Sequence, residues 1–168
     1  MKPFRLRVQE SLTARLEEIA TDHTGGPSFN LAGKVFRGRQ YFGDDTTLPF
    51  VSILEEPIAA EADFSNDTNE AGVSTYALMV QGFVDDNKDN PTDDAHYLMA
   101  DVKDVLAQIR VDSRETDRVL DFPSIAPTVT AISFGGGVVR PADEVSAVAY
   151  FWLRVVLTLV EDHDDSYA

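Results

Sequence analysis

The chain of 168 residues contains no cysteine and only three histidines. The missing thiols exclude disulfide bonds, thiolate metal sites and cysteine nucleophiles. His23 falls in a predicted loop, His96 near a helix start and His163 in the C-terminal tail. No two have the spacing of a helical zinc site, and none accompanies a serine and an aspartate in a triad. We therefore interpret them as surface side chains and expect a protein that is not an enzyme, with no catalytic residue, cofactor or metal ligand.

Basic residues are also scarce. There are 14 lysines and arginines against 29 aspartates and glutamates, which gives a formal net charge of −15. The only basic clusters are Lys2-Arg5-Arg7 and Lys34-Arg37-Arg39, too little to predict sequence-specific binding to nucleic acid. An acidic surface repels DNA, so a channel lined with carboxylates would let a duplex slide through. A role of the acidic residues in solubility alone fits the sequence equally well.

No apolar run is long enough to predict a membrane span. The most apolar stretch, 145–160, is interrupted by Arg154 and is shorter than the ~20 residues that a spanning helix requires. The N-terminus is basic but leads into Gln9, Glu10 and Ser11 rather than into an apolar segment. We therefore expect neither a secretory signal nor a membrane anchor.

One acidic run imitates the start of a calcium-binding loop. Asp85, Asn87 and Asp89 have the spacing of its first ligands, but Asn90 stands where a glycine makes the turn and His96 where a bidentate glutamate belongs. We interpret the run as an acidic loop that precedes a helix.

Two amphipathic helices are predicted, over 4–20 and from Thr92 to about Arg110. Thr92 is a candidate N-cap. Apolar side chains recur at helical spacing in both segments. They are Val8, Leu12, Leu16 and Ile19 in the first helix, and Leu98, Val102, Val105, Leu106 and Ile109 in the second.

Period-two alternation predicts strands over 34–39, 48–55, 73–84, 129–134, 138–140 and 145–160. The glycine run 135–137 lacks the lysine and hydroxyl residue of a phosphate loop, so it is interpreted as a bend between two strands. We predict an α+β fold in one domain over 1–168, with an acidic tail over 161–168. A mostly antiparallel sheet of four to five strands would carry both helices on one face.

Two of these strands are longer than the usual five or six residues. Each has one apolar face and one mixed face, and long strands with a mixed second face suit a contact between subunits. The candidate interface residues are Tyr150, Trp152, Arg154, Met79, Gln81 and Phe83 on the mixed faces, and Arg37 and Arg39. Packing of Trp152 under the second helix is an equal alternative, and the loops 37–47 and 62–72 are candidates for a second contact patch.

The whole chain resembles the tail terminator proteins of siphovirus-like (long-tailed) bacteriophages, the family of the phage lambda tail terminator. The resemblance lies in the order of elements after a helix from Arg5 to Ala20. These are KVFRGR (34–39), LPFVSILEEP (48–57), ALMVQGFVDD (77–86) with DAHYLMADV (94–102), and AYFWLRVVLTLVED (149–162). The family shares architecture more than residues, so no ring-lining or docking residue is carried over.

The resemblance implies a six-membered ring in the virion, at the head-proximal end of the tail, assembled in the host cytoplasm. Such a ring ends polymerisation of the tail tube and offers a docking surface to the head or neck. Its partners would be copies of itself, the tail tube protein, a neck or head-completion protein, and DNA that passes through the lumen without sequence-specific binding. The alternatives are another neck, tail-completion or tail tube subunit, a small-molecule-binding or hydrolytic α+β domain, and a generic interaction module.

Overall fold

The computed structural model describes residues 2–40, 42–43, 46–57, 72–161 and 167. Their elements are, in order, α1 (Phe4–Glu17), β1 (Ala20–Asp22), β2 (Ser28–Asn30), β3 (Val35–Arg37), β4 (Phe50–Glu55), β5 (Gly72–Val84), α2 (Asp93–Thr116), β6 (Thr128–Phe134), β7 (Val138–Arg140) and β8 (Ala149–Glu161). The fold is α+β, as predicted. The expected loop 62–72, apart from Gly72, and the acidic tail, apart from Glu161 and Tyr167, lie outside the described residues.

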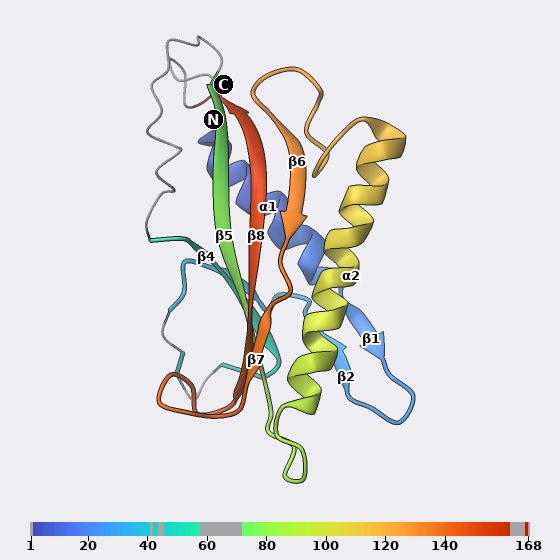
Figure 1. Ribbon diagram of the computed structural model, residues 1–168, viewed down its shortest axis with the longest axis vertical. Coiled ribbons are helices and arrows are strands. Elements are labelled where there is room, and N and C mark those ends of the chain that lie inside the picture. Colours follow the sequence, from blue (N-terminus) through green and yellow to red (C-terminus); the bar gives the residue numbers. More distant parts are fainter. Residues whose placement is uncertain (1, 41, 44–45, 58–71, 162–166, 168) are drawn as a thin grey trace.

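The main sheet is built around the two long strands. Its strand order is β3-β4-β5-β8-β6, and β7 pairs with β8 below β6 (Figure 1). β5 and β8 pair antiparallel along their whole length, from Gly72↔Glu161 to Val84↔Ala149. The described sheet thus has six strands rather than four to five, and one pair, β3 with β4, is parallel. The connection between β3 and β4, residues 38–49, is long enough for this parallel pairing, which a short hairpin loop would forbid.

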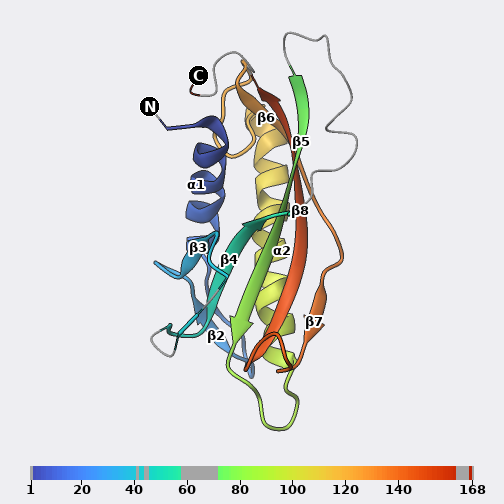
Figure 2. The ribbon, with the colours of Figure 1, turned by 90° about the vertical axis from the view of Figure 1, so that its left-hand side faces the viewer.

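Both helices lie on the same side of β8, as Figure 2 shows. The stripe of α1 that faces the sheet is fully buried at Val8, Leu12 and Leu16. The predicted stripe of α2 is buried except at Val105, which is partly buried, and the helix continues to Thr116, past the expected end at Arg110. Thr92 makes no side-chain capping bond, and Asp93 and Asp94 stand in the first turn, where the helix dipole favours acid.

The core lies between the helices and one face of the sheet, which we call the inner face. In β8 this face is apolar at every second residue, and all of these side chains are buried. They are Ala149, Phe151, Leu153, Val155, Leu157 and Leu159. This period-two burial confirms the predicted strand and leaves the other side chains of β8 on the opposite face, which we call the outer face.

A small hairpin was missed by the sequence analysis. The residues from Thr21 to Pro27 were expected to be loop, but Thr21 and Asp22 belong to β1, which pairs antiparallel with β2 beside α2 (Figure 1). Residues 23–27 connect the two strands. Its strands have three residues each, too few for a periodic pattern to show.

The last strand begins later than expected, at Ala149 instead of Val145. The Asp143 carboxylate accepts hydrogen bonds from the backbone N–H of Val145 at 2.8 Å and of Ser146 at 3.4 Å. This local turn competes with the strand for those N–H groups, so residues 143–148 form a loop at the start of β8. No helix in the described part of the chain is long and apolar enough to cross a membrane.

Candidate assembly surface

Aromatic side chains gather on the outer face, at the end of the sheet where β8 begins. The strand register places Phe50, Phe83 and Tyr150 side by side on β4, β5 and β8. In the next outward-facing row Gln81 lies opposite Trp152. Because side chains two residues apart share a face, the sequence alternation was sufficient to predict this grouping.

The rings form one continuous cluster. The Phe50 and Phe83 rings stack with centroids 4.7 Å apart, and the Phe83 and Tyr150 rings with centroids 6.0 Å apart. Phe42 covers the Phe50 ring at 4.0 Å, and Tyr150 contacts Trp152 at 5.7 Å. Such pairs stabilise a surface by about 0.5–1.5 kcal/mol each beyond the area they bury, so the cluster is a fixed feature of the outer face.

The structure brings six of the eight candidate residues together on this face: Tyr150, Trp152, Arg154, Met79, Gln81 and Phe83. Arg39 lies at the edge, with its guanidinium 4.6 Å from the centroid of the Phe36 ring. Arg37 points the other way and donates a hydrogen bond to the Thr13 hydroxyl of α1 at 3.1 Å. Alternation in β3 turns Arg37 away from Phe36, so this candidate faces α1 and not the outer face.

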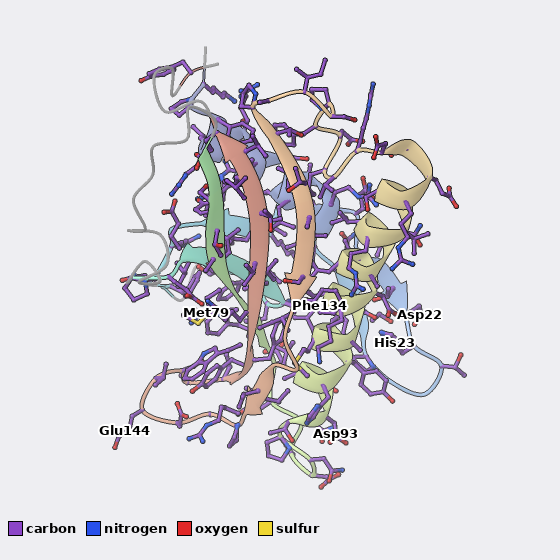
Figure 3. All side chains as sticks on the ribbon, turned by 45° about the horizontal axis from the view of Figure 1, so that its top comes forward. Asp22, His23, Met79, Asp93, Phe134 and Glu144 are labelled. Carbon is purple, nitrogen blue, oxygen red and sulfur yellow. The ribbon has the colours of Figure 1, made fainter. Side chains whose placement is uncertain are left out.

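Trp152 belongs to the outer face and not to the layer under α2. It packs against the cluster of Phe50, Phe83 and Tyr150, while the helix-facing core contains Phe151 and Leu153. The alternative that Trp152 merely packs beneath the second helix is therefore wrong. Figure 3 shows Met79 and Glu144 at one side of the molecule, away from the hairpin and α2.

The outer face is hollowed beside this cluster. A partly open hollow of about 640 Å³ lies between the loop after β3 and the loop before β8. Its walls contain Phe42, Leu48, Val148 and Trp152, with Gln40 and Gln81 among the polar residues. Among the described residues that line it, none is charged, although 26% of the chain is charged. We call this feature the uncharged hollow.

Asp143 holds the wall of the hollow that precedes β8. Besides its two backbone bonds, its carboxylate accepts a hydrogen bond from the Tyr150 hydroxyl at 2.9 Å. The backbone N–H of Val145 is the main reason that the pKa of Asp143 lies below its usual range, and the Tyr150 hydroxyl also lowers it. Asp143 is thus ionised at neutral pH and fixes the turn that carries Val145–Val148.

A short ion pair crosses the outer face next to the hollow. The Arg154 guanidinium donates hydrogen bonds to both carboxylate oxygens of Glu56, one of them at 3.1 Å. This bidentate bond lowers the pKa of Glu56. The Arg154 side chain remains half exposed, so the pair adds little to stability and serves to orient the guanidinium on the surface.

The indole N–H of Trp152 is buried and has no hydrogen-bond partner among the described residues. An unpaired buried donor costs about 1–3 kcal/mol. We expect Trp152→Phe to change the free energy of unfolding by less than about 1 kcal/mol, because the lost ring contacts are offset by removal of this donor. Tyr150→Phe breaks the bond to Asp143 and is expected to cost about 0.5–1.5 kcal/mol. We therefore expect Tyr150→Phe to lose more stability than Trp152→Phe. Urea unfolding measures both variants, and the reverse order would contradict this expectation.

A second polar group lies on the helix side, around His23. The carboxylate of Asp101, which is 6% exposed, accepts a hydrogen bond from the Thr21 hydroxyl at 2.6 Å and lies 3.1 Å from His23 Nε2. The His23 ring also packs 4.9 Å from the Tyr97 ring. His23 is therefore half buried and paired, contrary to the sequence interpretation. Through these contacts Asp101 joins the β1–β2 hairpin to α2. The described contacts of the His23 ring include no serine or threonine hydroxyl.

The acidic run after β5 is used for local structure. The Asn87 side chain accepts hydrogen bonds from the N–H groups of Asp89 and Asn90, and the Asp86 carboxylate accepts one from the N–H of Ala149 at 2.6 Å. Over the described ranges, no group of three or more histidines, aspartates or glutamates is arranged to hold a metal ion.

Comparison with known proteins gave no family model that matches the chain and no curated protein that is significantly similar to it.

Proposed function

We propose that the chain is a ring-forming virion protein that caps the head-proximal end of a phage tail tube, as tail terminator proteins do. It would end polymerisation of the tube and present a docking surface to the head or neck. The proposal starts from the resemblance in element order. The observation that carries it is the aromatic-lined hollow on the outer face, in which no described lining residue is charged although the chain has a net charge of −15.

The physical case for assembly rests on that contrast. Residues that meet water in a monomer of this composition should often be charged, and the lining of the hollow carries aromatic and amide side chains instead. Aromatic side chains with few charges are typical of the core of a protein–protein contact. The high negative charge of each copy would line an assembled ring with a field that repels DNA and lets it pass.

Polymerisation of the tail tube protein of the same phage tests this function. Added at far below one copy per tube subunit, the chain is expected to lower the plateau of light scattering, because one ring is sufficient to stop a whole tube. An unchanged plateau at equal molar amounts contradicts the proposal. Self-polymerisation of the chain into long tubes would instead identify a tube subunit.

One observation favours a second candidate function, a small-molecule-binding domain. A hollow of about 640 Å³ lies within the range of ligand sites, about 300–1,000 Å³. No charged side chain is described in its lining. A ligand for it would be apolar and neutral, and saturable binding of such a compound by the monomer would support this candidate.

A further inference from the structure

We propose that the uncharged hollow receives the tip of the loop between α2 and β6 of a second copy of this chain, with Ile125 as the inserted side chain. The inference rests on the proposed function and deepens it, because it names the two patches through which neighbouring copies would contact each other. We call residues 117–127, which carry this tip, the α2–β6 loop.

Ile125 is the most exposed large apolar side chain in the described part of the chain, at 79%. It stands between Pro123 and Pro127 in the segment FPSIAPT, residues 122–128, which contains no charged residue. Exposure of a large aliphatic side chain at the tip of an uncharged segment is typical of a binding surface when the rest of the surface is strongly charged.

The loop that carries Ile125 is fixed on both sides. The Phe122 ring packs edge-on against Phe4 of α1 with centroids 5.4 Å apart. The Ser124 hydroxyl donates to the Asp117 carbonyl at 2.9 Å, and the Ser11 hydroxyl of α1 donates to the Leu120 carbonyl at 2.9 Å. Because the loop is already ordered, its insertion into a partner would cost little conformational entropy.

The same loop also holds its backbone in an unfavourable conformation. Asp117, Leu120 and Asp121 have positive φ angles of 55°, 53° and 62°, and they are the only non-glycine residues with positive φ among those described. The left-handed conformation is unfavourable for Leu120, while aspartate tolerates it better. Strain of this kind persists where function requires a particular loop shape. Here that shape directs Ile125 outward.

The two patches match in chemistry. A charged side chain would lose its hydration in the hollow without a partner, which is costly. The segment around Ile125 avoids this cost because it has no charge. A hollow of about 640 Å³ is larger than one isoleucine side chain, so the flanking prolines and Ser124 would enter with it.

The two patches lie at opposite ends of the molecule, so one copy cannot join them by itself (Figure 1). Thr128, at the base of the loop, pairs with Val160, while Trp152 of the hollow lies eight residues earlier on β8. At a rise of about 3.3 Å per residue this separation is roughly 26 Å. Contact between two different patches is head-to-tail, and such contacts generate closed rings or open filaments.

Crosslinking tests the contact, and the absence of native cysteine makes every disulfide informative. We choose Ile125→Cys, on the exposed tip, and Gln81→Cys, on a half-buried wall residue whose one described side-chain contact is to the Met79 sulfur at 3.9 Å. Neither change should disturb folding. Under mild oxidation, the protein carrying both changes is expected to form a ladder of disulfide-linked oligomers. An equimolar mixture of the two single variants is expected to stop at crosslinked dimers.

The matched control replaces Ile125→Cys with Tyr97→Cys, since Tyr97 is also an exposed apolar residue but lies on the first turns of α2. This pair is expected to give no ladder. If the unmodified protein forms rings and the Ile125 and Gln81 pair gives no ladder, the inference is wrong and the proposed function stands. If the ladder forms but images show only open filaments, the contact is right and the ring function is wrong.

Introducing a charge into each of the two patches provides a second test of the same contact. Gln81→Glu places a carboxylate in the hollow and is expected to weaken association about tenfold or more, since this carboxylate loses its hydration when the loop of the second copy covers it. Ile125→Lys alone is expected to do the same. Combining both is expected to restore association, because the two charges then meet. Sedimentation velocity measures the self-association of each variant. A double variant that associates no more tightly than either single variant overturns the proposed contact.

Discussion

Replacing Gly82 with alanine is expected to lower the free energy of unfolding by about 1–3 kcal/mol, the cost of overpacking a core. Gly82 of β5 lies directly opposite Phe151 of β8, on the inner face. A Cβ at this position would lie 2.1 Å from the Phe151 Cε1 atom, far inside van der Waals contact. The Phe151 ring is fully buried and cannot move without disturbing the core.

Gly136→Ala is the matched control for this prediction. A Cβ at Gly136 meets nothing within 4 Å, so we expect its free energy of unfolding to stay close to that of the native chain. Adding Phe151→Leu to Gly82→Ala is expected to recover part of the loss, because residues in contact are not additive. Urea unfolding measures all four proteins. Equal stability of the two alanine variants would show that a Cβ at position 82 does not clash with the Phe151 ring.

Replacing Asp101 with alanine is expected to cost about 1–3 kcal/mol of stability, because it leaves the buried groups of Thr21 and His23 without their acceptor. The loss should appear first at the β1–β2 hairpin, which this carboxylate joins to α2. Hydrogen exchange is expected to show faster exchange of the hairpin amides, with the amides of β5 and β8 little changed.

Asp104→Ala is the control, since Asp104 is an exposed aspartate one turn further along the same helix. We expect its effect on unfolding to be within about 0.5 kcal/mol. If Asp101→Ala unfolds at the same urea concentration as Asp104→Ala, the carboxylate does not hold the hairpin.

The sheet and the outer face could be predicted because strand periodicity is local. The alternation through Met79, Gln81 and Phe83 and through Tyr150 and Trp152 was sufficient to place these side chains on one face. The strands that formed outside this pattern were the three-residue strands β1 and β2. Arg37 was predicted as an interface residue without a sheet face being assigned to it, and the structure turns it toward α1.

The hollow could not be predicted, because its walls come from segments without period. Phe42 follows β3 in a stretch of turn residues, and its ring contacts with Phe50 and Phe83 show that it covers the sheet. The wall at Val145–Val148 continued the apolar alternation of β8 in the sequence. It became a loop because Asp143 bonds to its backbone. The pairing of His23 with Asp101 joins residues 78 apart in the chain, and no short-range pattern reports such a contact.

Negative-stain imaging of tail tubes assembled in the presence of this protein tests whether the chain forms a ring that caps the tube. We expect a ring with a central hole at one end of each tube, and tubes that have stopped growing. Tubes with bare ends at every concentration of the protein, together with a protein that stays monomeric in solution, would contradict it.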